Sequence, residues 1–182
     1  MKLFTIGHSN HTFARFIELL DENRIKLVVD VRTTPYSKFN MQFDREIFKS
    51  RLSSEGFHYT YLGNNLGGRP SDPDCYKNRK LPGEKEETDY LHEVDYLAVM
   101  KKDWFLEGIR TLLELAKKQS TVIMCSEEDP DRCHRHHLIA KYLLANYPEI
   151  EIQHIRGDGN KYNAKDSHVS VEQPKAHQES LF

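Results

Sequence analysis

The sequence contains few cysteines and no long hydrophobic run. Its three cysteines, Cys75, Cys125 and Cys133, are scattered and make no disulfide framework. The first residues, MKLFTIGHSNHTF, lack the apolar run of a signal peptide, and no stretch approaches the length of a membrane span. We therefore expect a cytoplasmic protein whose thiols are reduced.

An excess of charge of either sign is also absent. Lys and Arg number 26 and Asp and Glu 28, which gives a formal net charge of −2. This balance argues against a generally basic nucleic-acid surface but leaves room for a local basic patch. The 182 residues, 38% of them hydrophobic, suffice for one domain with a single core, which we place at residues 1–156. Apolar residues almost vanish from Gly157 onward, so residues 157–182 are predicted to form a flexible polar tail.

Short apolar runs and amphipathic segments alternate along the chain. Runs rich in β-branched and aromatic residues predict five strands, at residues 3–6, 25–31, 57–62, 121–124 and 150–155. Segments with the 3.6-residue period predict helices after the capping residues Thr12 and Asp44, at residues 89–101 and 103–118, and from residue 132. Residues 63–70 are predicted to form a loop, and residues 71–88 an exposed polar insertion. This order predicts a single-domain α/β fold with a mostly parallel, doubly wound sheet of about five strands.

Chemically reactive residues gather where the predicted strands end. In doubly wound sheets the ligand crevice lies outside the carboxyl ends of the strands, so these residues are expected to share one site. His8 is a candidate general acid or base, Cys125 a candidate thiolate, and Glu127 a candidate base or nucleophile. The full set of catalytic candidates is His8, Asp30, Cys125, Glu127 and His134.

Several residues at the same strand ends are candidates for holding an anion such as phosphate. Arginine side chains match the shape of phosphate and remain charged. The anion-binding candidates are Ser9, Arg32, Ser37, Gly67, Gly68, Arg69 and Arg135. We expect one pocket to receive His8, Arg32, Cys125, Glu127 and Arg135.

The cysteines and histidines around residue 130 allow a second interpretation. Cys125, Cys133, His134 and His137 could bind zinc. The seven-residue gap between the cysteines, followed directly by histidine, does not match a recognised structural zinc pattern. The sequence therefore assigns no metal ligand and no cofactor, without excluding a metal.

Five short motifs occur in order along the chain: TIGHS, VDVR-x2-P-x-S, LGG, C-x-E and CHR. Together they resemble the bacterial and archaeal family catalogued as domain of unknown function 488, over about residues 3–155. The resemblance implies an α/β fold whose signature residues cluster in one pocket, and it implies no settled reaction. The positions that match are His8, Ser9, Asp30, Arg32, Pro35, Ser37, Gly67, Gly68, Cys125, Glu127, Cys133, His134 and Arg135.

The end of the chain carries a separate motif. Residues 178–182, QESLF, resemble the peptide by which bacterial polymerases and repair proteins dock on the sliding clamp. A mobile tether would let two terminal apolar side chains enter a pocket on the clamp. The candidate partner-binding residues are Gln178, Ser180, Leu181 and Phe182.

Three functions compete at this point. The first is an enzyme that acts on DNA or nucleotides, in DNA repair or defence, and hydrolyses a phosphodiester or an N-glycosidic bond. The second is a thiol enzyme that uses Cys125, like rhodaneses or thiol phosphatases. It ranks lower because four acids follow Cys125, at positions 127, 128, 129 and 131, and nearby negative charge raises a thiol pKa. The third is a non-catalytic, clamp-tethered adaptor that binds nucleic acid.

Overall fold

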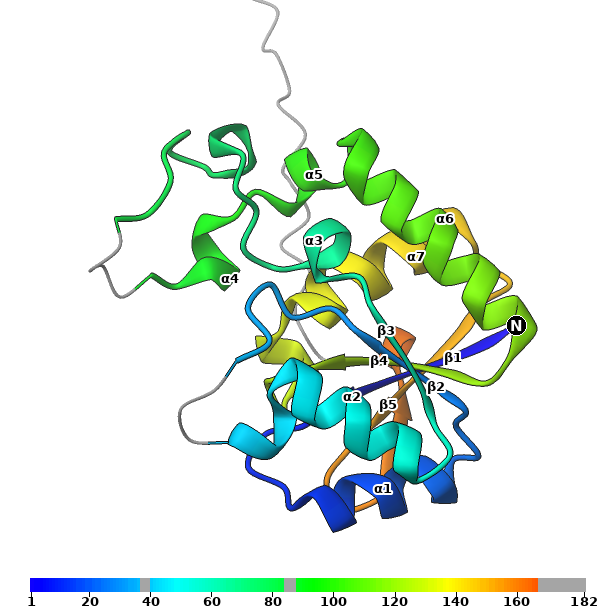
Figure 1. Ribbon diagram of the computed structural model, residues 1–182. Helices are drawn as coiled ribbons and strands as arrows, with labels where there is room; N and C mark the ends of the chain where they lie inside the picture. The colour runs from blue at the N-terminus through cyan, green and yellow to red at the C-terminus, as the bar shows by residue number, and fades with distance from the viewer. Residues whose placement is uncertain (37–39, 84–87, 167–182) are drawn as a thin grey trace, which may run out of the picture.

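The computed structural model describes residues 1–36, 40–83 and 88–166, and it contains one sheet. The strand order is β3-β2-β4-β1-β5-β6. The first five strands in this order are parallel, as predicted, and β6 joins the edge antiparallel to β5 (Figure 1). The strands are β1 (Lys2–Gly7), β2 (Leu27–Asp30), β3 (His58–Tyr61), β4 (Thr121–Cys125), β5 (Glu151–Ile155) and β6 (Lys161–Asn163).

Helices cover both faces of this sheet, so the fold is a three-layer α/β/α arrangement. In Figure 1, α1 and α2 lie on one side of the strands and α6 and α7 on the other. The α-helices are α1 (Phe13–Glu22), α2 (Arg45–Ser54), α3 (Gly63–Leu66), α4 (Tyr90–Glu93), α5 (Tyr96–Val99), α6 (Asp103–Lys118) and α7 (Lys141–Asn146). Short 3-10 turns are η1 (Met41–Phe43), η2 (Pro73–Cys75), η3 (Pro130–Arg132) and η5 (Ala164–Asp166), and η4 (Arg135–Ala140) is a π-helix that runs directly into α7.

Each sheet face has its own hydrophobic core because alternate strand residues point to opposite faces. Ile6, Val28 and Met124 pack with the phenylalanines of α1, η1 and α2. Leu3, Val29 and Ile123 point to the other face and pack with α6, η4 and α7. Strands β1, β2 and β4 are therefore buried on both faces, as their nearly continuous apolar sequences predict.

The region between β3 and α6 differs from the prediction. Residues 63–70 contain the short helix α3, and residues 89–101 form α4 and α5 instead of one helix. The break occurs because Val94 is extended and pairs with Tyr76 in an antiparallel bridge. The Asp95 side chain then accepts the Ala98 amide and caps a new helix. Residues 71–83 are also not wholly exposed, since Cys75 and Tyr76 are buried.

The prediction of a tail from Gly157 is wrong for its first ten residues. Strand β6 pairs its backbone with β5 from Gln153 to Ile155, and Ala164 is buried. This pairing depends on main-chain groups of an edge strand, so a low content of apolar side chains does not prevent it. Residues 167–182 lie outside the part of the chain that the structure describes.

The described helices include none that is both long and apolar enough to cross a membrane. The three cysteines are free thiols.

Candidate active site

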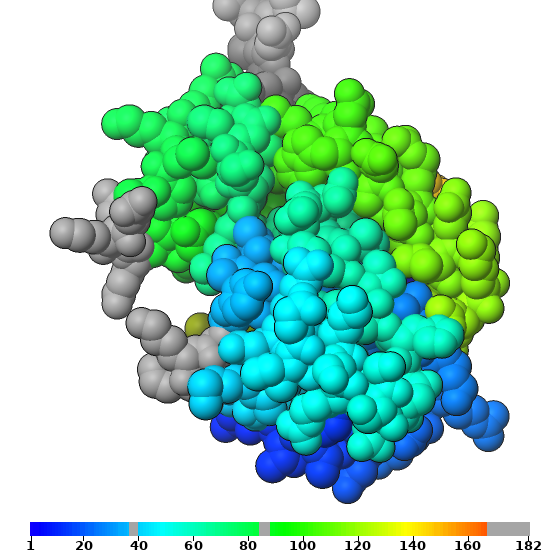
Figure 2. Space-filling model, viewed as in Figure 1, coloured from blue at the N-terminus to red at the C-terminus, as the bar shows by residue number. Residues whose placement is uncertain are grey.

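A cavity of about 1220 Å³ lies at the carboxyl ends of β1, β2 and β4. The strands are in register there, with Gly7 beside Cys125 and Asp30 beside Met124. Figure 2 shows the surface hollowed between the green segment, around residues 70–100, and the blue and cyan part of the chain that precedes it. A smaller hollow of about 610 Å³ is lined by surface residues between Asp74 and Lys102 and contains none of the predicted site residues. The larger cavity is therefore the candidate site.

The predicted residues divide into two groups. Those that line the cavity are His8, Ser9, Arg32, Gly68, Arg69, Cys125, Glu127 and His134. Asp30, Gly67 and Arg135 do not line it, so four of the five side chains expected to converge do so and Arg135 does not. Ser37 and the four candidate partner-binding residues, Gln178, Ser180, Leu181 and Phe182, lie outside the described residues.

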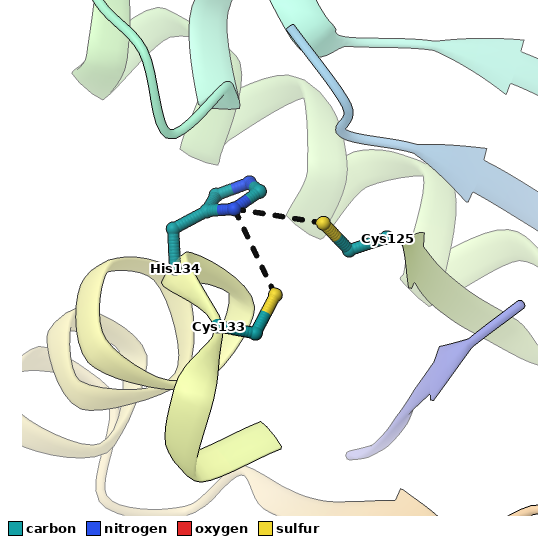
Figure 3. Close-up of side chains that lie close together, drawn as sticks. All are labelled: Cys125, Cys133 and His134. Carbon is teal, nitrogen blue, oxygen red and sulfur yellow. Dashed lines mark hydrogen bonds between the residues drawn. The ribbon is translucent and has the colours of Figure 1, made fainter. Parts of the chain in front are cut away.

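Two cysteines and a histidine meet on one wall of the cavity. Cys125 ends β4, whereas Cys133 and His134 immediately precede η4 (Figure 3). The Nδ1 atom of His134 lies 3.6 Å from Sγ of Cys125 and 3.8 Å from Sγ of Cys133. The other ring nitrogen, Nε2, lies 3.1 Å from the carbonyl oxygen of Val31, which can only accept, so Nε2 carries a proton. In the neutral ring the Nδ1 lone pair therefore faces both sulfurs.

The environments of the two thiols favour one thiolate over the other. A hydrogen bond with Cys133, followed by burial, raises the pKa of Cys125. Burial opposes ionisation of Cys133, but the hydrogen bond with Cys125 and the nearby Arg135 and His134 lower the pKa of Cys133 below its usual range. The Arg135 backbone N–H also donates to Sγ of Cys133 at 3.5 Å. Cys133, rather than the predicted Cys125, is the more acidic thiol.

Two glycines allow the elements around the site to pack closely against each other. A Cβ on Gly68 would lie 2.6 Å from Cγ of His134, so only glycine leaves room for the imidazole ring. A Cβ on Gly7 would lie 1.8 Å from the backbone oxygen of Glu127, so β1 directly supports the loop after β4. Gly67 has a different role, since it packs against Thr33 and the Gly63 carbonyl behind the cavity.

Arg32 is held by a buried network at the end of β2. Its guanidinium donates to both oxygens of Asp30, at 2.9 and 2.6 Å, and to the Phe43 carbonyl at 2.9 Å. The hydroxyl of Tyr59 donates to the same carboxylate at 2.8 Å. Asp30 is fully buried, so its place in this structure is to orient Arg32, and it does not contact the cavity.

His8 belongs to the same network. Its Nε2 atom lies 3.1 Å from Nη1 of Arg32, which can only donate, and its Nδ1 atom lies 2.9 Å from the Ser9 carbonyl, which can only accept. These partners fix the neutral ring with the proton on Nδ1. Burial, and then the charge of Arg32, lower the pKa of His8 to about 4. Because Arg32 occupies the Nε2 lone pair, the geometry does not favour the predicted general acid–base role, and His8 instead orients Arg32.

Arg135 is buried under the loop after β4 rather than presented to an anion. Its guanidinium donates to the backbone carbonyls of Glu127 and Glu128 and to the Thr5 hydroxyl. Arg135 therefore positions the loop that carries Glu127. Its charge also lowers the pKa of Cys133, so it acts on the site through its neighbours.

Two acids of this loop are paired with a cation that the sequence analysis did not consider. Arg156 forms ion pairs with Glu128 and Asp129. Glu128 also accepts the Gly157 amide at 3.0 Å. These contacts turn two of the four acids toward β5, which removes part of the reason for ranking the thiol hypothesis lower. Arg156 was missed, although it follows a predicted parallel strand and the strand-end rule that selected Arg32 applies to it equally.

Other cavity residues were missed because they come from the segment predicted to be exposed. Tyr90 and Tyr96 line the cavity, and the guanidinium of Arg69 lies 4.5 Å from the centre of the Tyr90 ring. Arg132 also lines the cavity and is exposed. The exposed Arg69 and Arg132, with an aromatic ring beside one of them, place two cations and a stacking surface in a lining that also contains Asp89, Glu127 and Asp131.

Comparisons with known proteins support the family assignment. Neither curated proteins nor solved structures gave a match to the chain. A family model described as "Domain of unknown function DUF488" matches residues 12–143, a range that includes Arg32, Gly68, Cys125 and His134 but not His8. Because this range covers well over half of the 182 residues, the chain belongs to the DUF488 family.

Proposed function

We propose that this protein is a hydrolase that acts on a nucleotide or a nucleic-acid strand and cleaves a phosphodiester or an N-glycosidic bond. The observation that carries the proposal is the cavity at the strand ends, in which Glu127 lies with the cluster of Cys125, Cys133 and His134. Ligands of α/β proteins bind at this end of the sheet.

The cavity edge supports an anionic substrate. Arg69 and Arg132 are exposed there and can reach phosphate, whereas Arg32 is buried and held in place by Asp30. Tyr90 offers a ring on which a base can stack. The volume of about 1220 Å³ exceeds the size of ordinary small-molecule pockets and accommodates a nucleotide.

Glu127 is the proposed general base. It is exposed in the cavity, and its side chain forms no ion pair with any other described residue. In the proposed reaction its carboxylate accepts a proton from water as the water oxygen attacks phosphorus or the sugar carbon. The bond to the leaving oxygen or base nitrogen then breaks, and the leaving group takes up a proton.

A product assay tests the proposal. Purified protein is incubated with nucleoside triphosphates and with single- and double-stranded oligonucleotides, and chromatography separates shortened strands from free bases. We expect one class of product, a loss of at least about 100-fold for Glu127→Gln, and normal turnover for the exposed Glu149→Gln. Absence of both products from the wild-type protein would contradict the proposal.

A thiol enzyme is the second candidate, and the lowered pKa of Cys133 favours it. The same assay separates the two candidates. The response to Glu127→Gln distinguishes them: if a thiolate is the nucleophile, Glu127→Gln retains part of the turnover while Cys125→Ser or Cys133→Ser abolishes it, whereas the hydrolase loses at least about 100-fold on Glu127→Gln. We expect instead that Glu127 matters at least as much as Cys125.

The setting we propose is cytoplasmic DNA repair or defence. The motif at residues 178–182 supports docking on the bacterial sliding clamp, and it rests on sequence alone because these residues lie outside the described structure. A non-catalytic adaptor would share this docking but would release no product in the assay above.

A further inference from the structure

We propose that Cys125, Cys133 and His134 bind one zinc ion and leave its fourth coordination position open to the cavity. Among the described residues, these three are the group of His, Cys, Asp and Glu side chains whose ligand atoms gather closely enough to hold a metal, all within 4.8 Å of one another. Zinc prefers thiolate sulfur and imidazole nitrogen.

The spacing of the three atoms fits a tetrahedral ion. Zinc lies about 2.3 Å from sulfur and about 2.0 to 2.1 Å from nitrogen, so tetrahedral angles place sulfur and nitrogen about 3.6 Å apart. The observed separations from Nδ1 of His134 are 3.6 Å to Cys125 and 3.8 Å to Cys133. In Figure 3 the imidazole nitrogen and both sulfurs point toward a common centre. Both sulfur-to-nitrogen separations are therefore close to those of a tetrahedral zinc site.

Two of the three ligands, His134 and Cys133, already have the outer contact that metal ligands need. The Nε2–H of His134 donates to the Val31 carbonyl, which leaves Nδ1 as the free lone pair and fixes the plane of the ring. Gly68 lies against that ring, and a side chain at this position would displace it. Sγ of Cys133 accepts the backbone N–H of Arg135, a contact that stabilises bound thiolate.

The site is a set of three protein ligands because the nearby His137 is engaged elsewhere. Its Nε2 atom lies 2.7 Å from the Asp131 carbonyl, and its Nδ1 atom lies 3.3 Å from Nζ of Lys141. Structural zinc sites have four protein ligands, whereas catalytic sites have three and bind water at the fourth position. Since all three ligands line the cavity, the open position faces the space where substrate would bind.

The role of the ion deepens the proposed hydrolase and rests on it, although metal binding itself does not. Zinc lowers the pKa of a bound water to about 7. The water would lose its proton to Glu127, and the resulting hydroxide would attack the substrate. Any thiol that is protonated in the free protein releases its proton when the ion binds, so binding is accompanied by proton release.

Metal analysis of the full-length protein tests the site. Protein purified under reducing conditions is stripped with a chelator, reloaded with Zn²⁺ or Co²⁺ and assayed for metal content. We expect one ion per chain, a thiolate-to-cobalt charge-transfer band, and X-ray absorption that shows two sulfur and two nitrogen or oxygen neighbours. These wild-type measurements decide the question even if a ligand variant fails to fold.

Variants assign the ligands. Cys133→Ser and His134→Gln should each weaken metal affinity by at least about 100-fold. Cys75→Ala removes the thiol buried in the core, and His137→Gln removes a histidine from the same cavity; both should bind the ion as tightly as the wild type. Absence of stoichiometric metal, a coordination shell without sulfur, or a Cys125–Cys133 disulfide in the reduced preparation would overturn the inference.

The two proposals can fail separately. Stoichiometric metal with no hydrolysis product supports the zinc site and removes the hydrolase. Hydrolysis that persists in chelated, metal-free protein supports the hydrolase and overturns the role of zinc in it.

Discussion

The buried pair of Asp30 and Arg32 shows how a residue outside the cavity can fix the position of a side chain that lines it. Both side chains are nearly inaccessible, at 0% and 4% exposure, and their charges are compensated mainly by each other. Removing one partner of such a pair leaves an uncompensated charge in a region that water does not reach. The position of Arg32 in the cavity therefore depends on a carboxylate that does not itself line the cavity.

Asp30→Asn is predicted to lower the free energy of unfolding by about 3 to 5 kcal/mol, because the guanidinium then remains buried without its counter-charge. Chemical denaturation measures the loss. The matched control is Glu151→Gln, which removes the exposed partner of Lys2, and it should change stability little because solvent screens this pair. Equal effects of the two substitutions would contradict the assigned role of Asp30.

Gly68→Ala is predicted to displace the His134 ring, since the new Cβ would lie 2.6 Å from Cγ of that ring. The backbone of Gly68 does not require glycine conformationally, so the expected effect is steric. We expect at least about a 10-fold loss of metal affinity and of any hydrolytic activity, with a far-ultraviolet spectrum like that of the wild type. An unchanged affinity would mean that the ring can bind metal from another position.

At the scale of elements, the sequence correctly predicted the helices and strands whose formation depends on local apolar periodicity. The parallel sheet, α1 and α6 follow directly from apolar spacing, and α1 also from its capping residue Thr12. The prediction was wrong where pairing between distant segments determines the local structure. At Val94, for example, a bridge to Tyr76 breaks a predicted helix. The same holds for β6, which exists because β5 offers an unpaired edge.

In the candidate site, too, the sequence predicted which residues come together but not the contacts between them. The position of His8, Arg32, Cys125 and Glu127 at strand ends correctly predicted that they share one cavity, because the carboxyl ends of parallel strands lie at the same edge of the sheet. It could not show that Arg32 would occupy the lone pair of His8. A local signal for Arg135 was present, since this residue precedes Leu138 and Ile139 by three and four positions and so shares their buried face.

The contact of η4 with β5 buries two histidines without charge. Nδ1 of His136 lies 3.0 Å from Nε2 of His154, and Nδ1 of His154 lies 2.7 Å from the Thr5 hydroxyl. Burial, and then the charges of His136 and Arg135, lower the pKa of His154 to about 3. Burial, followed by His137 and Lys141, lowers the pKa of His136 to about 4. Both rings are therefore neutral in the folded protein near neutral pH.

Folding stability is predicted to fall in acid because of these two residues and because of His8, whose pKa is also lowered to about 4 by burial. The unfolded chain binds a proton at each histidine near pH 6.5, whereas the folded chain does not until pH 3 to 4. The contribution of the neutral histidines to the free energy of unfolding is thus fully present well above pH 6.5. As the pH falls from 6.5 toward the folded-state pKa, each histidine lowers the free energy of unfolding by about 1.4 kcal/mol per pH unit. Urea denaturation between pH 7 and 4.5 measures the slope.

His154→Gln should reduce that slope by about 1.4 kcal/mol per pH unit, since one titrating group is removed. His58→Gln, at an exposed position on β3, is the control and should leave the slope unchanged. If His154→Gln retains the wild-type slope, acid sensitivity arises elsewhere in the protein.

At the scale of the whole molecule, the sheet places its reactive strand ends on one side, and the chain continues beyond it. The last described residue is Asp166, and sixteen residues follow, ending in QESLF. Tethering to a partner raises the effective concentration of an enzyme at its substrate without any change in the cavity. A clamp that encircles DNA would supply that advantage to a nucleic-acid hydrolase.

Deleting residues 178–182 is therefore predicted to abolish binding to a bacterial sliding clamp while leaving the unfolding midpoint unchanged. Leu181 and Phe182 can each contribute about 1.5 to 3 kcal/mol when buried in a partner, before ordering costs, which corresponds to weak, reversible docking. Calorimetric titration of purified clamp measures the binding. The double substitution Leu181→Ala and Phe182→Ala keeps the chain length and should behave like the deletion, whereas Glu172→Ala, outside the motif, should bind like the wild type. Equal binding by the intact and the shortened chain, or no binding by the intact chain, would remove the argument for a repair setting and leave the nucleic-acid proposal to depend on the cavity alone.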